Sequence, residues 1–203
     1  MKLKNVIFDF GQVIVHFEPD YMVRQYVTDK DDASLLSEVV FDRLYWDELD
    51  RGTITNEEVL CECKKRLPER LWEVADQIYY NWIYNIPEID GMCELVTYLK
   101  EKYGLRVFLL SNISKYFASH KDEIPSLKLF EKCVFSGLLG IVKPSKEIFD
   151  YLCNVCEILP EETIFVDDNE ANIRGSEAFG IKGYVFDGDA KGLKKYFDEI
   201  CGE

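Results

Sequence analysis

The chain has 203 residues, with 24 lysine and arginine residues against 38 aspartate and glutamate residues, so its formal net charge at pH 7 is −14. Apolar residues make up 47% of the sequence, which is the composition of a soluble globular protein that buries a sizeable core. The negative charge repels nucleic-acid phosphates and anionic membranes, and the sequence has no long lysine- or arginine-rich run to offset it. Nucleic-acid and membrane partners are therefore not expected.

Two features of the sequence predict a cytoplasmic protein. The apolar run that begins at Val6 is interrupted by Asp9, so it is too short for a signal-peptide core or a membrane span. The seven cysteines are an odd number in a chain with no secretory signal, which favours reduced thiols over a disulfide framework. The composition leaves the oligomeric state open.

Short apolar runs alternate with helical patterns, and the alternation predicts an α/β fold with a Rossmann-like parallel sheet. The runs are rich in β-branched and aromatic residues, as buried parallel strands are, and they lie at residues 6–8, 107–110, 134–135, 164–166 and 184–186. Helical spacing of apolar residues follows over 91–102 and over 145–159.

Residues 17–87 differ from the rest, because they contain helix signals and no convincing strand. The capping box that starts at Thr55 with Glu58 three residues later predicts one helix start, and proline at Pro87 predicts the end of the helical region. We therefore predict an α/β core of residues 1–16 and 88–203 with a helical insertion at 17–87. Since ligands bind at the carboxyl ends of parallel strands, an insertion after the first strand is expected to cover the site as a lid.

Carboxylates follow two of the predicted strands. Asp9 ends the first run, although an aspartate there also fits a residue that starts a turn. Asp167 and Asp168 end another run, and adjacent carboxylates repel each other unless a cation or hydrogen-bond donors compensate. Hard oxygen ligands without a nearby histidine or thiolate favour Mg²⁺, while an acidic helix N-terminus explains the pair equally well.

Two further strand ends carry groups that suit an anion. Ser111 and Asn112 offer a hydroxyl, an amide and backbone N–H groups, although this pair is also an ordinary helix cap. Lys143 precedes a proline, where a fixed ammonium group would offset carboxylates and phosphate oxygens. Most lysines, taken singly, are solvated surface residues.

The order of these motifs resembles that of the haloacid dehalogenase superfamily of phosphatases, and the resemblance covers essentially the whole chain. The motifs that carry it are Asp9, then Ser111-Asn112, then Lys143-Pro144, then Asp167-Asp168 with Asn172. The segments Phe8-Asp9-Phe10-Gly11 and Asp50-Arg51-Gly52-Thr53-Ile54 are most similar to the branch with α-glucose-1-phosphate phosphatase and the phosphatase domain of soluble epoxide hydrolase.

The resemblance implies a helical cap over the site and a phosphatase that acts on small phosphorylated metabolites, with sugar phosphates first among them. Asp9 would attack phosphorus to form an aspartyl-phosphate. Mg²⁺ would be held by Asp9, the carbonyl of Gly11 and Asp168, with Asp167 in support, although the sequence leaves open which of the two adjacent aspartates binds the metal directly.

The resemblance also implies the groups that bind the substrate. Ser111 and its neighbours, including Asn112, would bind the phosphoryl oxygens. Lys143 would neutralise Asp9 and the phosphate together, and Asn172 would brace the metal-binding loop.

One position departs from the pattern of the superfamily's phosphatases. Two residues after the nucleophile most of them have a second aspartate, which protonates the leaving group, and this chain has Gly11. The enzyme would then favour good leaving groups such as anomeric phosphates, or take an acid from the helical insertion. His16 and Glu18 are near enough in sequence to be candidates, and each also fits a hinge or surface residue.

Two other functions stay open from the sequence. A metal-independent 2-haloacid dehalogenase would use Asp9 to attack carbon, but the paired aspartates would repel its carboxylate substrate. A non-catalytic binding module would explain the loss of the acid at Gly11. The substrate-facing side of the insertion is not defined by the sequence: Tyr79, Tyr80, Trp82 and Tyr84 fit its core, and Tyr45, Trp46 or Arg51 could also face the site.

Overall fold

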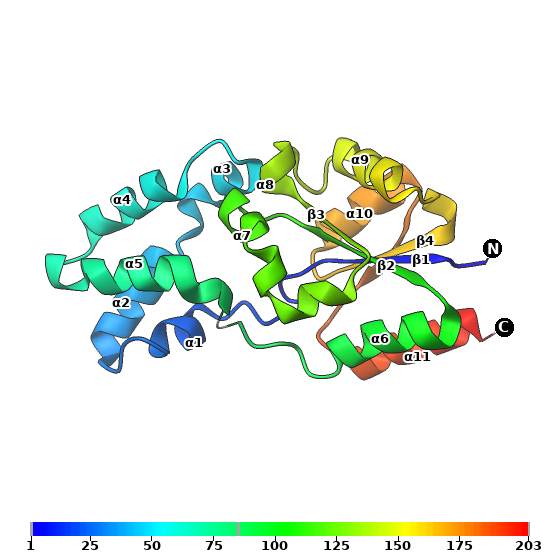
Figure 1. Cartoon of the computed structure of the whole chain (residues 1–203), viewed down its shortest axis with the longest axis horizontal. Coiled ribbons are helices and arrows are strands. Elements are labelled where there is room, and N and C mark those ends of the chain that lie inside the picture. Colours follow the sequence, from blue (N-terminus) through cyan, green and yellow to red (C-terminus); the bar gives the residue numbers. More distant parts are fainter. Residues whose placement is uncertain (1, 85, 203) are drawn as a thin grey trace.

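The computed structural model describes residues 2–84 and 86–202, and the three remaining positions of the predicted core and insertion, 1, 85 and 203, lie outside the described residues. Five parallel strands form one sheet in the order β3-β2-β1-β4-β5. This confirms the predicted α/β sheet (Figure 1). The strands are β1 (Asn5–Phe8), β2 (Arg106–Ser111), β3 (Lys132–Phe135), β4 (Thr163–Asp167) and β5 (Lys182–Val185).

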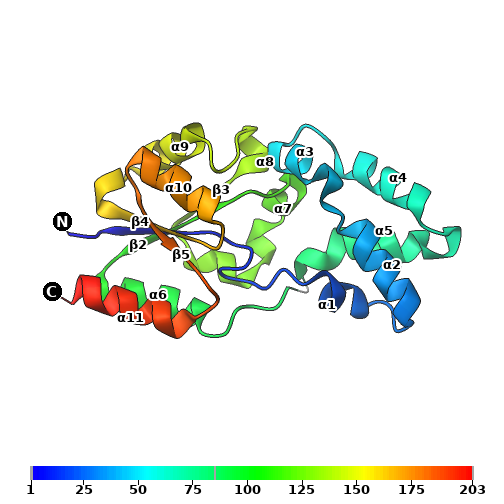
Figure 2. The ribbon, with the colours of Figure 1, turned by 180° about the vertical axis from the view of Figure 1, so that it is seen from behind.

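Helices cover both faces of the sheet, because alternate strand residues point to opposite sides. On one face Val6 and Phe8 pack with α6 (Met92–Tyr103) and α11 (Ala190–Cys201). On the other face Ile7 packs with α9 (Lys146–Cys156) and α10 (Glu170–Phe179). Figure 2 shows α9 and α10 on the opposite side of the sheet from α6 and α11. The shorter elements are α7 (Lys115–Ser119), η4 (Lys121–Glu123), η5 (Pro125–Leu129), α8 (Ser136–Leu139) and η6 (Pro160–Glu162).

The helix predicted over 145–159 ends earlier than its apolar spacing suggests. The backbone turns left-handed at Glu157, with φ 53°, and its N–H bonds to the carbonyl of Asn154 at 3.4 Å. Leu159, which the periodicity includes, is 54% exposed and lies beyond the helix. The apolar pattern therefore predicts the buried face of α9 correctly and its last residues wrongly.

The region between β1 and α6 contains no strand among its described residues and has its own apolar core, to which Leu36, Leu60 and Ile78 contribute. The capping box predicted at Thr55 is present, with Glu58 returning a hydrogen bond to the Thr55 N–H at 2.9 Å. The helices are α1 (Pro19–Arg24), α2 (Lys30–Val40), η1 (Arg43–Tyr45), α3 (Trp46–Arg51), α4 (Asn56–Arg66), η2 (Glu69–Leu71), α5 (Trp72–Asn81) and η3 (Trp82–Tyr84).

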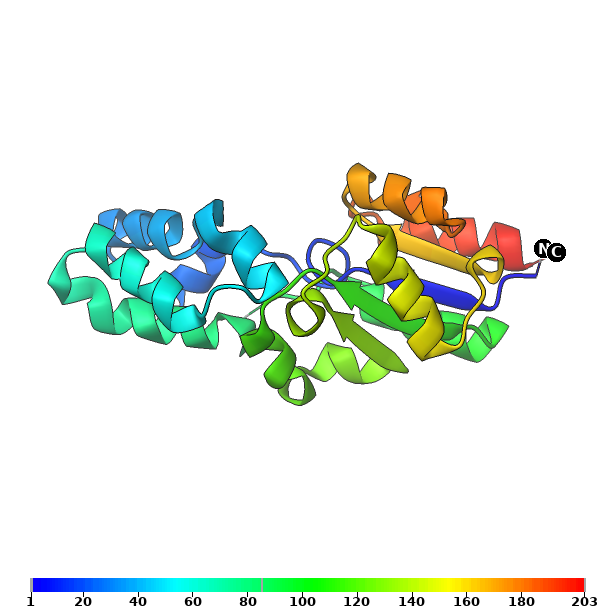
Figure 3. The same cartoon turned by 90° about the horizontal axis from the view of Figure 1, so that it is seen from above.

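The two connections to this helical region run side by side. The His16 N–H donates to the carbonyl of Pro87 at 2.8 Å, and the Ile89 N–H donates to the carbonyl of Ile14 at 2.9 Å. Figure 3 shows the helical region beyond the end of the sheet opposite to the two chain termini. The insertion therefore lies at the carboxyl ends of the strands, where a parallel sheet binds ligands. Among the described helices, none combines the length and apolar character that crossing a bilayer requires.

Candidate active site

Several of the predicted site residues lie at the carboxyl ends of three neighbouring strands, β2, β1 and β4. Phe8 is paired with Leu109 on one side and with Val166 on the other, so the residues that follow these strands emerge together. The Asp9 N–H still donates to the carbonyl of Val166 at 2.9 Å, which fixes the main chain of Asp9 beside β4. The sheet register thus explains why carboxylates from distant parts of the sequence meet.

Lys143 is the buried cation of this cluster. Its side chain is 1% exposed, and its Nζ lies 2.7 Å from Asp9 Oδ1 and 2.7 Å from Asp167 Oδ2. Burial lowers the pKa of Lys143, but the two carboxylates outweigh burial and raise it, so the ammonium stays charged. Burial raises the pKa of Asp9 to about 7, with Lys143 opposing the shift and Asp167 adding to it. A second positive charge near Asp9 would therefore favour its ionised form.

Asp167 is fully buried, and both of its oxygens are engaged by the protein. Asn172 Nδ2 donates to Oδ1 at 3.1 Å and to Oδ2 at 3.0 Å. The Asn169 N–H donates to Oδ1 at 2.8 Å, and Lys143 binds Oδ2. The Asn172 amide therefore holds the buried carboxylate of Asp167 in place, while its predicted role in bracing the metal-binding loop stays a prediction.

Asp168 has the opposite environment from its neighbour, because its side chain is exposed to the cavity above the sheet. Partial burial and Asp167 raise its pKa, while Lys143 and Arg43 lower it. Oxygens of Asp9, Asp167 and Asp168 lie within 4.8 Å of one another. Three carboxylates around a single buried ammonium leave excess negative charge, which suits a hard divalent cation with oxygen ligands.

Gly11 lies in a tight turn after Asp9 and lines the same cavity. The Phe10 carbonyl accepts hydrogen bonds from the N–H groups of Ile14 and Val15, and the chain passes through φ 58° at Gln12. A Cβ at Gly11 would meet no atom within 4 Å. The turn therefore leaves Gly11 on the cavity lining, with open space where a side chain would project.

Ser111 and Asn112 both line the cavity, but they have different surroundings. Ser111 is buried at the end of β2. Asn112 bonds to the main chain of Lys143 with both ends of its amide: Nδ2 donates to the carbonyl at 3.0 Å, and Oδ1 accepts from the N–H at 2.8 Å. The Asn112 side chain thus holds the main chain of Lys143. Its predicted contact with the phosphoryl oxygens stays a prediction.

The cavity has a volume of about 330 Å³ and lies between the sheet edge and the helical insertion. Half-buried aromatic rings form its wall on the insertion side. The ring of Phe17 is packed edge to face against Phe41, Trp46 and Trp82, with centroid distances of 5.7, 5.2 and 5.5 Å. Phe17 therefore fixes the other three rings at angles that turn an aromatic wall toward the site.

Two charged residues in the cavity wall were not singled out as ligands in the sequence. Arg43 lies over the Trp46 ring, with its guanidinium carbon 4.8 Å from the centroid, and no sequence motif marks it. Asp50 lies on α3, and its only signal was membership of the family-like segment 50–54. The predicted candidates His16 and Glu18 do not line the cavity.

Several hydrogen bonds hold the helical insertion against the core. Lys115 Nζ donates to the carbonyl of Gly52 at 2.8 Å, and the Tyr116 hydroxyl donates to the carbonyl of Tyr80 at 3.0 Å. Gly52 has φ 65°, and a Cβ there would lie 2.5 Å from the carbonyl oxygen of Gly137. The close approach of these two glycines lets α3 pack against α8 at the rim of the site.

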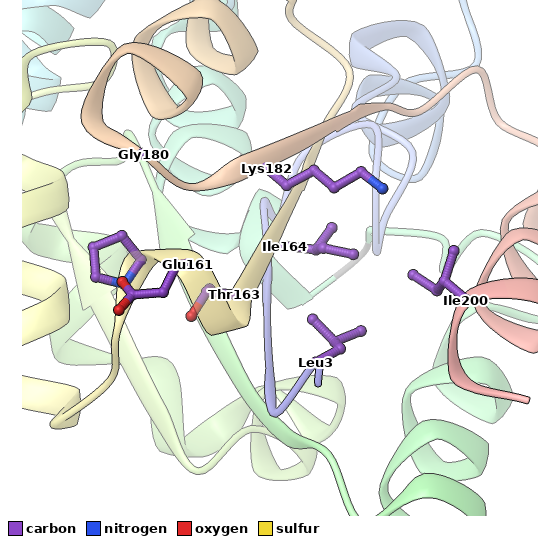
Figure 4. Close-up of a pocket in the computed structure, with 8 residues that line it drawn as sticks. Leu3, Glu161, Thr163, Ile164, Gly180, Lys182 and Ile200 are labelled. Atoms are coloured by element: carbon purple, nitrogen blue, oxygen red, sulfur yellow. The ribbon is translucent and has the colours of Figure 1, made fainter. Parts of the chain in front are cut away.

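A second hollow lies at the opposite end of the sheet, near the amino end of β4, where Thr163 and Ile164 begin the strand (Figure 4). Leu3 and Ile200 line its apolar side, and Lys182 extends across it. None of the site residues predicted from the sequence borders this hollow. The predicted residues instead gather under the helical insertion.

Comparisons with known proteins agree with this arrangement. A family model described as haloacid dehalogenase-like hydrolase matches residues 3–180. The chain is 26% identical over 191 residues to a D-ribitol-5-phosphate phosphatase of Bacteroides thetaiotaomicron, covering 90% of this chain and 91% of the relative. It is 24% identical over 183 residues to a sesquiterpene phosphatase of Aspergillus oryzae, covering 89% and 88%.

Solved structures share the fold. A haloacid dehalogenase family enzyme of Bacteroides thetaiotaomicron, solved in complex with magnesium and inorganic phosphate, superposes with a TM-score of 0.68. The two are 21% identical, and the match covers 94% of this chain and 98% of that one. The parallel sheet with its helical insertion is therefore a known arrangement.

Proposed function

The chain belongs to the haloacid dehalogenase-like hydrolases and is a phosphatase, and we propose that it hydrolyses small phosphorylated metabolites with Mg²⁺ through an aspartyl-phosphate at Asp9. The observation that carries the proposal is the cluster in which Lys143 joins Asp9 and Asp167 at 2.7 Å each, beside Asp168 and beneath a cavity.

Asp9 is the nucleophile in this proposal. Lys143 holds Oδ1 from one side, so the carboxylate is oriented before the substrate arrives. The other oxygen attacks phosphorus, a bond from Asp9 to phosphorus forms, and the bond to the leaving oxygen breaks with its electron pair. Water then displaces the Asp9 oxygen from phosphorus and regenerates the carboxylate.

The residues that would hold Mg²⁺ are Asp9, the carbonyl of Gly11 and Asp168. Asp167 is engaged by Lys143 and Asn172, so it supports the ligands rather than binding the metal directly. When bound, Mg²⁺ would supply positive charge against the phosphoryl oxygens and the carboxylates. The rest of the charge compensation comes from the buried ammonium of Lys143.

Ser111 would donate its hydroxyl to the transferring phosphoryl group, since it lines the cavity at the end of β2, the neighbour of β1. Lys143 would bind the same group, because its ammonium lies in the lining beside Asp9. Asn112 acts on the phosphoryl group indirectly, because its side chain fixes the main chain of Lys143. We assign Asn112 a positioning role for this reason.

The cavity supports a small substrate with an organic group that contacts aromatic rings. Its volume of about 330 Å³ is at the lower end for small-molecule sites. Aromatic rings such as Trp46 and Trp82 pack against sugar and polyol carbons as well as against apolar chains. The similarity to a protein named D-ribitol-5-phosphate phosphatase supports placing sugar and polyol phosphates first in the proposed substrate class.

The insertion over residues 17–87 is proposed to be the substrate-selecting cap, with the catalytic core at 1–16 and 88–203. The aromatic wall and Arg43 come from the insertion, while the carboxylates and Lys143 come from the core. Substrate choice and chemistry would thus reside in different segments of the chain.

The test is phosphate release from a panel of sugar phosphates, polyol phosphates, nucleotides and an aryl phosphate, with Mg²⁺ and with EDTA. Turnover is expected only with Mg²⁺, and Asp9→Asn should lower it by about three orders of magnitude or more. A matched control is Asp90→Asn, since Asp90 is exposed and lies outside the cavity lining. Halide release from 2-haloacids in EDTA, or substrate binding without turnover, would overturn the proposal in favour of a dehalogenase or a binding module.

A further inference from the structure

The proposed phosphatase lacks an acid at Gly11, and the surrounding space is open. Apart from its two chain neighbours, no described residue has an atom within 4 Å of where a Cβ at Gly11 would be. Phosphate esters of simple alcohols have poor leaving groups, and a proton donor typically accelerates such a departure by about 10² to 10⁴. Hydrolysis of polyol or sugar alcohol phosphates therefore requires an acid from elsewhere in the cavity.

The two candidates nearest in sequence do not meet this need. His16 and Glu18 have side chains that are 43% and 57% exposed, and His16 Nδ1 lies 4.0 Å from Glu18 Oε1. Neither residue borders the cavity. A proton donor must come within hydrogen-bond reach of the leaving oxygen, so a side chain outside the lining is unsuitable.

Asp50 is placed differently. Apart from Asp9 and Asp168, it is the one carboxylate among the described residues that line the cavity. It also lines an adjoining hollow that shares Lys143 and Asn112, so it borders both spaces. Within the described part of the chain, no hydrogen bond or ion pair at contact distance engages its carboxyl group. The group is therefore available to a substrate.

Resting on the proposed phosphatase function, we propose that Asp50 of the helical insertion is the general acid and base that replaces the missing acid at Gly11.

The electrostatic surroundings of Asp50 suit this role. Burial raises the pKa of Asp50 to about 7, Lys143 opposes the shift, and Asp47 one helical turn earlier adds to it. The other charged residues that line the two hollows are Arg43 and Arg51, which are cationic, and the carboxylates of Asp9 and Asp168. A carboxyl group with this pKa can carry a proton near neutral pH and also release it.

Asp50 gives up one proton in the first step and regains one in the second. As Asp9 attacks, the bond from phosphorus to the leaving oxygen breaks, and that oxygen takes its electron pair and the proton of Asp50. The Asp50 carboxylate then removes a proton from water as the water oxygen bonds to phosphorus and the Asp9 oxygen departs. Asp50 ends protonated, and the net reaction is ester plus water to alcohol plus phosphate.

The contacts of α3 hold Asp50 in position. After Asp50 the helix ends at Gly52, whose N–H bonds to the carbonyl of Leu49 at 2.9 Å and whose carbonyl accepts from Lys115 at 2.8 Å. Since Lys115 belongs to the core, this bond ties the segment that carries Asp50 to the core. The acid is thus delivered to the site when the helical insertion is docked.

The test compares two substrates in single turnovers with enzyme in excess, so that only the first step is observed. Glycerol 3-phosphate has a poor leaving group, and p-nitrophenyl phosphate has a leaving group that needs no proton. Asp50→Asn is expected to slow the first substrate by about 100-fold or more and the second by less than about threefold. Glu48→Gln is the matched control, since Glu48 is exposed on the same helix and borders neither hollow.

Gly11→Asp supplies an independent test, because the open space at Gly11 accepts a side chain. If Asp50 is the acid, Gly11→Asp in the otherwise native chain changes glycerol 3-phosphate cleavage little, and in the Asp50→Asn chain it restores most of the lost rate. A large acceleration by Gly11→Asp alone, or equal slowing of both substrates by Asp50→Asn, would overturn the inference. Absence of turnover in the native chain on every phosphate would instead refute the proposed phosphatase function.

Discussion

Replacing Lys143 by methionine tests the charge arrangement at the centre of the site. The change keeps a linear side chain and removes the ammonium group that lies 2.7 Å from both Asp9 and Asp167. The Lys143 side chain is 1% exposed there. At an effective dielectric constant of about 20, each such contact is worth several kcal/mol before the cost of burial. Loss of one partner of a buried ion pair typically costs about 3 to 5 kcal/mol, so we expect a loss of that size in metal-free protein at pH 8.

The assay is urea unfolding in EDTA, arranged as a double-mutant cycle with Asp167→Asn. Removing the buried carboxylate first should reduce the cost of Lys143→Met by about 2 kcal/mol, because one of the two uncompensated charges is then absent. Lys146→Met is the control, since Lys146 is exposed three residues away and should change stability by less than about 0.5 kcal/mol. A cost for Lys143→Met below about 1 kcal/mol, or no coupling to Asp167, would refute the reasoning.

Three further predictions concern single contacts of the site. Gly52→Ala forces a Cβ to within 2.5 Å of the Gly137 carbonyl oxygen at a backbone φ of 65°, so urea unfolding should show a loss of about 1 to 2 kcal/mol; unchanged stability would contradict the packing. Asn172→Ala removes donors from both oxygens of buried Asp167 and should cost about 2 to 3 kcal/mol in the same assay, whereas a loss under about 0.5 kcal/mol would show that the contact is unimportant. Because burial raises the pKa of Asp50 to about 7, the folded state holds this proton more tightly than the unfolded chain, and native stability falls as pH rises from about 4 to 7. Between pH 5 and pH 8, the free energy of unfolding of Asp50→Asn should therefore rise by up to about 2 kcal/mol relative to that of the native chain. Parallel pH profiles of the unfolding free energy of the two proteins would contradict the pKa shift.

The architecture could be predicted because each strand is a short buried run with a polar residue at its end. Ile7 and Phe8 pack on opposite faces of the sheet, so the run that contains them has no polar side and is recognisable in the sequence. Asp9 follows Phe8 directly, so its place at the carboxyl end of the strand is fixed by the strand itself. The helix start at Thr55 was equally local, since the capping box needs only residues 55–58.

The contacts that depend on distant segments could not be predicted from these local patterns. Asn112 and Lys143 are 31 residues apart, and only the folded chain shows that the amide of one holds the main chain of the other. The environments of Asp167 and Asp168 differ for the same reason, because Lys143 and Asn172 reach only the first of them. Adjacent identical residues give no local signal of this difference.

The site residues of the insertion were harder to predict from the sequence than those of the core. Asp50 lies on the short helix α3, and the sequence marked it only as part of the family-like segment 50–54. It lines the cavity in the folded chain, where Gly52 packs closely against Gly137. Arg43 is similarly marked by its contact with Trp46 rather than by any motif. Docking of one segment on another is a tertiary property, which hydrophobic periodicity does not report.

Trapping of the phosphorylated enzyme tests the central claim most directly. The native protein would be mixed with a sugar phosphate labelled in its phosphoryl group, in the presence of Mg²⁺, quenched with acid during turnover, digested and mapped by mass spectrometry. We predict a hydroxylamine-sensitive phosphoryl group on the peptide that contains Asp9, and none in the Asp9→Asn protein or in EDTA. Turnover that leaves Asp9 unlabelled, or a label on any other residue, would contradict the account.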